Sequence, residues 1–133
     1  MTIYALSSGP GLSGIAVIRI SGSDTKKVLQ NMTFLKLPEA KVATLRKFKN
    51  PETKDLIDEG ILLWFPGPES YTGEDMAEFH VHGSKAVVEA MHSSLSKING
   101  CRLAEPGEFT KIAFQNGKIN LLKAESISDL ISS

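Results

Sequence analysis

The sequence predicts an α+β fold in which a mixed β-sheet packs against helices. Short runs rich in β-branched and apolar residues, such as Thr2 to Ser7 and Ile15 to Ile20, alternate with loops of glycine, proline and asparagine, which is typical of strands. Elsewhere apolar residues recur with the helical period, as from Val87 to Ile98. A chain of 133 residues with 41% hydrophobic side chains has the size and composition of a globular domain.

The first two strands are expected to be joined by a glycine-rich loop and followed by a helix. Ile15 to Ile20 is apolar at every position but Arg19, which predicts a strand that is covered on both faces. Ser23 or Asp24 is expected to cap the helix, because both side chains can accept a hydrogen bond from its first turn. The buried stripe of this helix is predicted at Val28, Leu29 and Met32.

A hairpin and a further strand come next. Val42 to Phe48 and Leu56 to Phe65 flank the polar segment Asn50 to Lys54, which predicts two antiparallel strands joined by a turn. Met76 to His82 alternates in polarity and is expected to form the following strand. Ser84 then opens a helix with apolar positions at Val87, Val88, Met91, Leu95 and Ile98.

The remaining elements are shorter. Asn99–Gly100 is expected to close the preceding helix, and a strand is predicted from Arg102 to Ala104. Pro106 opens a helix that Asn116–Gly117 ends, and Asn120 is the expected N-cap of a last helix. The apolar stripe of that last helix is still unfinished at the end of the chain, which suggests a piece of a longer protein or a helix that docks on a partner.

Composition and charge exclude several classes of protein. Fifteen Lys and Arg side chains balance fifteen Asp and Glu side chains, so a strongly basic, nonspecific nucleic-acid binder is not indicated. Residues 36–54 are locally basic, which fits either a solvated hairpin or an RNA-binding patch. The single cysteine, Cys101, cannot form an internal disulfide, and the sequence holds no long apolar run and no secretory signal. We therefore expect a cytoplasmic protein with no membrane segment.

Two nucleotide-binding motifs can be tested against the sequence. Gly9 to Gly14 matches G-x-G-x-x-G, but the dinucleotide motif needs a helix directly afterwards, and Ile15 begins a predicted strand. A P-loop is absent from the sequence, because Gly117–Lys118 is followed by Ile119 rather than by serine or threonine. These residues therefore do not form a nucleotide hydrolase by themselves.

Glu78, His80 and His82 are the most suggestive cluster. Alternate residues of a strand share a face, so these three side chains should line one side of the sheet. Three interpretations stay open, namely a polar face closed by hydrogen bonds, a pocket for an organic ligand, and a zinc or iron site. Arg19, inside an apolar strand, needs an anionic partner, which could be an acidic residue of the segment 74–78 or a ligand.

Several motifs, in order along the chain, resemble one family. The sequence resembles the N-terminal domain of the tRNA-modification GTPases called MnmE or TrmE. The motifs that carry this resemblance are Thr2-Ile-Tyr-Ala, Gly14-Ile-Ala-Val-Ile-Arg-Ile-Ser-Gly22, Leu63-Trp-Phe-Pro-Gly-Pro-Glu-Ser-Tyr-Thr-Gly-Glu-Asp75, Glu78-Phe-His-Val-His-Gly83, Pro106-Gly-Glu-Phe-Thr110, Ala113-Phe-Gln-Asn-Gly-Lys118 and Ala124-Glu-Ser-Ile-Ser-Asp-Leu-Ile131. They cover nearly the whole chain. The Phe-His-Val-His-Gly motif resembles that of the mitochondrial and alphaproteobacterial members.

The resemblance implies a tetrahydrofolate-binding and dimerisation domain over residues 1–119. Its fold would be that of the folate-binding domain of glycine-cleavage aminomethyltransferases, and residues 120–133 would begin a helical domain. The family forms homodimers through this domain and acts with the flavoprotein MnmG to place an aminomethyl-type group on carbon 5 of the tRNA wobble uridine. GTP hydrolysis, with its Mg2+ and K+, is implied for a GTPase domain outside these residues, so the chain is an enzyme only as part of the full-length protein.

The resemblance also implies three folate-binding residues, Arg19, Glu78 and Lys118, and no catalytic or metal-binding residue. A carboxylate such as Glu78 can accept the pterin amino group and ring N–H together, while Arg19 and Lys118 can donate to the folate carbonyl, formyl and carboxylate groups. The cofactor would be 5-formyltetrahydrofolate or a related reduced folate. Two alternatives are a pure dimerisation and docking module with a vestigial folate pocket, and an independent aminomethyltransferase, which would need a second folate-contacting domain and a catalytic acid.

Overall fold

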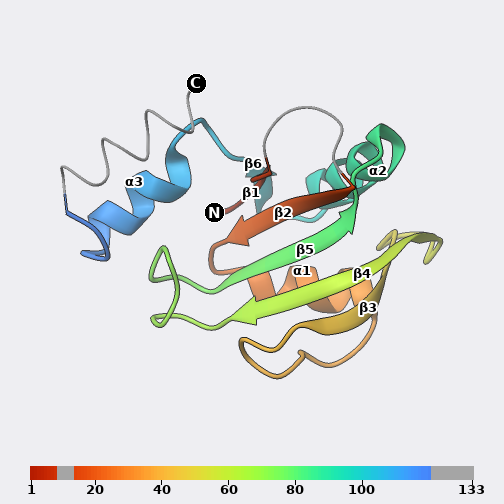
Figure 1. The fold of residues 1–133 in the computed structure, drawn as a ribbon, viewed down its shortest axis with the longest axis horizontal. Helices are drawn as coiled ribbons and strands as arrows, with labels where there is room; N and C mark the ends of the chain where they lie inside the picture. Colours follow the sequence, from red (N-terminus) through yellow and green to blue (C-terminus); the bar gives the residue numbers. More distant parts are fainter. Residues whose placement is uncertain (9–13, 121–133) are drawn as a thin grey trace.

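The computed structural model describes residues 1–8 and 14–120 and contains one mixed sheet, in the strand order β3-β4-β5-β2-β1-β6 (Figure 1). The strands are β1 Thr2–Leu6, β2 Ile15–Ser21, β3 Thr44–Lys49, β4 Leu56–Phe65, β5 Met76–His82 and β6 Cys101–Leu103. The helices are α1 Thr25–Thr33, α2 Lys85–Ser96 and α3 Glu108–Gln115. All neighbouring strands are antiparallel except β1 and β6. The predicted α+β class is confirmed.

The main core lies between the sheet and the first two helices. Alternate residues of β2, β4 and β5 point to this side, and Ile18, Leu62 and Phe79 are fully buried there. The stripe predicted for α1 supplies Val28, Leu29 and Met32, and α2 supplies Met91 and Leu95. Figure 1 shows α1 behind the sheet, so one sheet face is covered by helices.

The prediction that β2 is covered on both faces is wrong. Ala16, Ile18 and Ile20 are buried, whereas Val17 and Arg19 are only partly buried. The alternation arises because α1 and α2 cover only one face of the sheet. The other face is left partly open along the centre of the sheet, and this is the face that presents Arg19.

The β3–β4 turn and the α2 cap agree with the predictions, whereas α1 lacks its predicted capping bond and Gly107, not Pro106, holds the N-cap position of α3. Asn50 Oδ1 accepts a hydrogen bond of 2.8 Å from the Glu52 N–H, which fixes the predicted β3–β4 hairpin turn. Ser84 caps α2 as predicted, its hydroxyl accepting from the Val87 N–H. Asp24 holds the N-cap position of α1 but makes no capping hydrogen bond, and its own N–H donates to the Thr2 hydroxyl instead.

The third helix packs on the opposite face, at one end of the sheet. Phe109 of α3 forms a small second core with Ile3 and Met76. Glu108, in the first turn of this helix, accepts hydrogen bonds from both terminal nitrogens of Arg102 on β6 and from the Glu105 N–H. Figure 1 shows α3 to one side of the strands, so it borders the open face without covering it.

Two further predictions concern the loops and the chain end. Ile15 begins a strand and not a helix, as expected, so the dinucleotide interpretation of the glycine-rich loop fails at its required helix. The last predicted helix, from Asn120 onward, lies outside the described residues except for Asn120 itself. Among the residues that the structure describes, no helix is long and apolar enough to cross a bilayer.

The Arg102–Glu108 pair makes the stability of the α3 end depend on pH. Side-chain hydrogen bonds from Arg102 lower the pKa of Glu108 below its ordinary value, against the opposing effect of burial. Because the folded-state pKa is lowered, the stabilisation is complete above the unfolded pKa of about 4.3 and is lost as the pH falls through the folded pKa.

We expect Glu108→Gln to lower the free energy of unfolding by about 1 kcal/mol at neutral pH, with the difference vanishing in acid. Urea denaturation of both proteins at neutral and acidic pH measures this. An equal decrease in the free energy of unfolding at both pH values would show that the charge of Glu108 does not contribute to stability.

Candidate functional site

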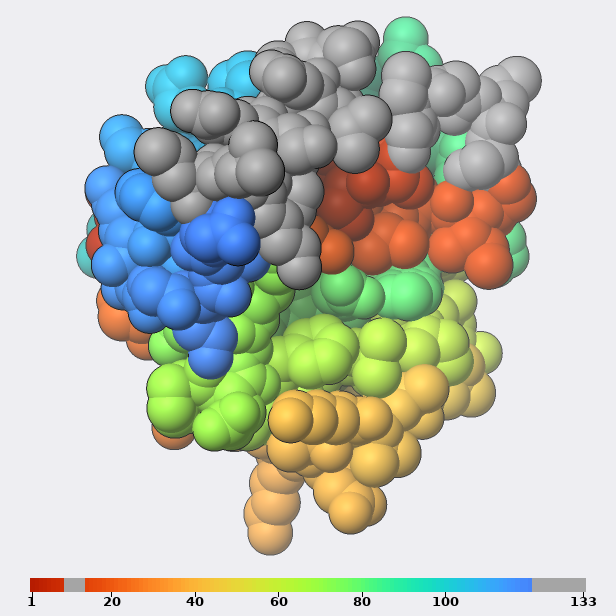
Figure 2. Space-filling model, turned by 60° about the vertical axis from the view of Figure 1, so that its left-hand side comes forward, coloured from red at the N-terminus to blue at the C-terminus, as the bar shows by residue number. Residues whose placement is uncertain are grey.

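The candidate site lies on the open face of the sheet, where β2 and β5 run side by side. Arg19 and Glu78 are register partners across these two strands, and Ala5 and Leu63 flank them on β1 and β4. Figure 2 shows this face with β5 recessed between β2 and β4 and with α3 at one end. The site therefore lies along a recessed strand of the open face, with α3 at one end.

Glu78 is held between two cationic or polar neighbours. One Arg19 terminal nitrogen lies 3.3 Å from Oε2, and His80 Nε2 lies 3.0 Å from Oε1. The Glu78 side chain is only 19% exposed, so these contacts replace much of its hydration. Each carboxylate oxygen has two lone pairs and uses one here, so each oxygen of Glu78 can still accept one more hydrogen bond.

Arg19 also lies against an aromatic ring. Its guanidinium carbon is 5.7 Å from the centre of the Tyr71 ring, within the range of a cation–π contact. The Tyr71 hydroxyl is 3.2 Å from the Thr110 hydroxyl of α3, which fixes the ring between the sheet and the helix. Arg19 Nε is buried and has no hydrogen-bond partner within residues 1–8 and 14–120, so the guanidinium keeps one donor that none of these residues accepts.

Tyr71 belongs to the β4–β5 loop, residues 66–75, which is fixed by polar contacts to the sheet. The Ser21 hydroxyl of β2 lies 2.8 Å from the Thr72 hydroxyl and donates to Glu74 Oε1, also at 2.8 Å. Asn116, at the end of α3, donates from Nδ2 to the Thr72 carbonyl at 2.7 Å. The loop therefore joins β2 to α3 and places Tyr71 beside Arg19.

Lys118 lies in a hollow that Tyr71 also lines. Its ammonium donates to the Pro68 carbonyl at 2.9 Å, in the same β4–β5 loop, where the Gly67–Pro68 peptide bond is cis. The hollow around it, of about 450 Å³, is lined by Phe65, Glu69, Ser70, Tyr71, Lys118 and Ile119. The structure thus brings Arg19 and Glu78 into direct contact and places Lys118 in an adjoining hollow, with Tyr71 common to both.

The two histidines of β5 have different partners. His80 contacts Glu78, whereas His82 Nδ1 lies 2.8 Å from Asp58 Oδ1 at the outer end of β4. Burial opposes the charge on Asp58, but hydrogen bonds from the His82 backbone and ring outweigh it and lower the pKa of Asp58 below its ordinary value. In the part of the chain that the structure describes, no group of three His, Cys, Asp or Glu residues could hold a metal ion, so the metal interpretation has no ligand set here.

Sequence reasoning identified some of these contacts and missed others. Glu78 was one of three acidic residues expected to pair with Arg19, and it is the one that does so. Of the other two, Glu74 bonds to Ser21 and Asp75 Oδ1 accepts from the Gly67 N–H. Tyr71 was not recognised as part of the site. Its signal was its position in a glycine-rich loop directly before the strand that carries Glu78.

Comparison with known proteins identifies the family. The family model described as GTP-binding protein TrmE N-terminus matches residues 2–118, which is most of the chain. This chain belongs to that family. The match includes all three candidate residues, and Lys118 is its last position.

Individual relatives agree with the TrmE N-terminus assignment. The chain is 74% identical over 132 residues to the tRNA modification GTPase MnmE of Pelagibacter ubique. The matched region covers 99% of this chain and 30% of that relative. The chain is 46% identical over 130 residues to MnmE of Parvibaculum lavamentivorans, with 98% and 30% covered. It is 48% identical over 130 residues to a mitochondrial 5-taurinomethyluridine-tRNA synthase subunit of Danio rerio, with 98% and 26% covered. The chain thus spans under a third of the length of these relatives.

We expect the Arg19–Glu78 pair to be energetically coupled, because both side chains lie partly buried on the sheet. A double-mutant cycle with Arg19→Met and Glu78→Gln should give a coupling of about 1 kcal/mol in urea denaturation. The matched control is the exposed pair Lys85–Glu89 of α2, whose atoms are 3.9 Å apart and whose coupling should stay below about 0.5 kcal/mol. Equal couplings in the two cycles would contradict a preorganised site.

Proposed function

We propose that this chain is the folate-binding domain of a tRNA-modification GTPase and that it binds a reduced folate of the 5-formyltetrahydrofolate type. The observation that carries the proposal is the Glu78 carboxylate, held by Arg19 and His80 on the partly open face of the sheet. A carboxylate in this setting is oriented before any ligand arrives. Membership in the TrmE N-terminus family supports the same assignment.

The pterin ring suits this carboxylate. Its exocyclic amino group and the neighbouring ring N–H form two parallel donors, which the two oxygens of Glu78 can accept together. Arg19, directly beside Glu78, would then lie near the ring carbonyl and the formyl oxygen, both of which accept hydrogen bonds. The Tyr71 ring, already against Arg19, offers an apolar surface next to the pterin.

The tail of the folate suits the adjoining hollow. The tail ends in carboxylates, and Lys118 is the cation that lines the hollow next to Tyr71. We therefore assign Arg19 to the pterin end and Lys118 to the tail end. A ligand held at both ends would be placed with its one-carbon group over the open sheet face, where a reaction partner can reach it.

The family assignment extends the proposal to the full-length protein. We propose that the chain forms a homodimer, that residues 1–119 form the folate domain and that residues 120–133 begin a helical domain. The full-length protein would hydrolyse GTP with Mg2+ and K+ in a separate domain and act with an MnmG-type flavoprotein on the wobble uridine of tRNA. The proposed setting is the bacterial cytoplasm, since the bacterial relatives are named as tRNA modification GTPases.

Calorimetric titration with 5-formyltetrahydrofolate tests the folate proposal. We expect saturable binding by the unaltered chain and at least about tenfold weaker binding by Glu78→Gln, because the variant can no longer accept both pterin donors on a charged group. Glu89→Gln, an exposed change of the same kind on α2, is the control and should bind normally.

The oligomeric state, measured in the same samples by sedimentation, separates the remaining outcomes. A folded dimer that binds no folate would favour the alternative of a docking module with a vestigial pocket. Equal binding by Glu78→Gln and Glu89→Gln would place the folate elsewhere and contradict the proposed role of Glu78.

A further inference from the structure

The outer edge of the sheet carries a concentration of unpaired positive charge. We use the name basic edge for the cationic side chains of residues 36–54, which are Lys36, Lys41, Arg46, Lys47, Lys49 and Lys54. Only Glu39 and Glu52 oppose them within this segment. None of the six forms an ion pair with a carboxylate in residues 1–8 and 14–120, whereas Arg19 and Arg102 elsewhere on the sheet each do. Their charge is therefore available to a partner.

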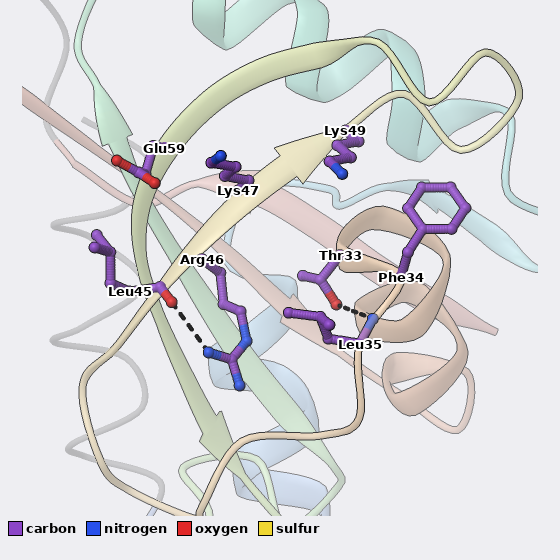
Figure 3. Close-up of a pocket in the computed structure, with 8 residues that line it drawn as sticks. All are labelled: Thr33, Phe34, Leu35, Leu45, Arg46, Lys47, Lys49 and Glu59. Atoms are coloured by element: carbon purple, nitrogen blue, oxygen red, sulfur yellow. Dashed lines mark hydrogen bonds between the residues drawn. The ribbon is translucent and has the colours of Figure 1, made fainter.

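A groove runs along this edge between β3 and the end of α1. It has a volume of about 280 Å³, and its lining includes Thr33, Phe34 and Leu35 on one side and Arg46 and Lys49 on the other. Figure 3 shows the Arg46 side chain extending from the strand toward Leu35, with Lys49 nearer to Phe34 at the other end. Lys47 and Glu59 also line the groove, so it combines three cations and one carboxylate with an apolar wall.

Phe34 is in an unusual conformation for its size. It ends α1 with φ 58°, in the left-handed region that glycine or asparagine normally occupies, and its side chain is 40% exposed. The Lys54 ammonium lies 5.3 Å from the ring centre, so one part of the ring surface already receives a cation. A bulky ring in a strained position at the surface is better explained by a binding role than by packing.

Arg46 has spare donor capacity. One terminal nitrogen donates to the neighbouring Leu45 carbonyl at 3.1 Å, and Nε is buried without a partner among the residues that the structure describes. Guanidinium groups bind phosphate through two donors at once, and lysine adds a point charge. Arg46 and Lys49 together can therefore hold a phosphodiester beside the Phe34 ring.

We propose that this groove binds a single-stranded segment of RNA, with a base stacked on Phe34 and backbone phosphates on Arg46 and Lys49. Alternation of an exposed aromatic ring with cations is the arrangement that binds single strands, since the ring takes any base and the cations follow the backbone. The surface lies at the opposite edge of the sheet order from β1 and β6, apart from Arg19 and Glu78. The choice of RNA rests on the proposed function, while the stacking and phosphate contacts rest on the groove itself.

The test is fluorescence anisotropy with a labelled single-stranded RNA of about 12 nucleotides at several salt concentrations. We expect the double variant Arg46→Gln/Lys49→Gln to bind at least about tenfold more weakly and to show a salt slope shallower by about 1.4, because two phosphate contacts are lost. The control Lys85→Gln/Lys97→Gln removes the same charge from exposed positions at and beyond α2 and should bind normally.

Phe34→Gly gives an independent readout that does not depend on charge. Glycine fits the positive φ, so the fold should be at least as stable in urea, while RNA binding should weaken about tenfold through loss of the stacked ring. Normal RNA binding by Phe34→Gly would overturn the stacking role. If both double variants weakened RNA binding equally, the binding would depend on the net charge of the protein and not on the groove, which would contradict the proposal.

Two further outcomes would overturn the RNA proposal. Poly-glutamate that competes as well as RNA, with no effect of Phe34→Gly, would indicate an acidic polypeptide as the partner. Aggregation of Arg46→Gln/Lys49→Gln with unchanged RNA affinity would mean that the cations only protect the sheet edge. Folate titration of the same variants separates this inference from the proposed function, since a loss of RNA binding with normal folate binding concerns the groove alone.

Discussion

The site depends on one partly buried carboxylate whose two oxygens each contact a neighbouring side chain. Glu78 lies on a central strand with its side chain 19% exposed, and it is stable there because Arg19 reaches it from β2 and His80 from two positions along β5. This arrangement requires β2 and β5 to pair in their observed register, since a shift by one residue would turn Arg19 into the hydrophobic core. The register of the core and the geometry of the site are therefore set by the same strand pairing.

The β4–β5 loop extends this constraint to the rest of the site. Ser21 of β2 and Asn116 at the end of α3 both bond to Thr72, so the loop cannot shift without disturbing the sheet or the helix. Tyr71, next in the chain, is thereby fixed against Arg19, and Pro68 of the same loop accepts the Lys118 ammonium. The fold brings residues from both ends of the chain close to Tyr71, while α1 and α2 stabilise the sheet from behind.

Much of this could be predicted from the sequence, because the local signals agree with the fold. The strand runs, the Ser84 cap and the Asn50 turn all appear where their residue types require. The open face behind Arg19 could not be predicted, because coverage of a strand depends on how many helices pack on each side of the sheet. The role of Tyr71 could not be predicted either, because it contacts Arg19 and Thr110, which are distant in sequence. The assignment of Arg19, Glu78 and Lys118 to folate came from the family resemblance, and the pairing geometry supports it without testing it.

The proposed role of the Glu78 carboxylate is to recognise the pterin edge. The most direct measurement is a crystal structure of the chain with 5-formyltetrahydrofolate bound. We predict that the pterin amino group and the adjacent ring N–H lie within about 3.2 Å of the two Glu78 oxygens, with the folate tail toward Lys118. A bound folate whose pterin edge donates to another acceptor, and does not contact Glu78, would contradict this role.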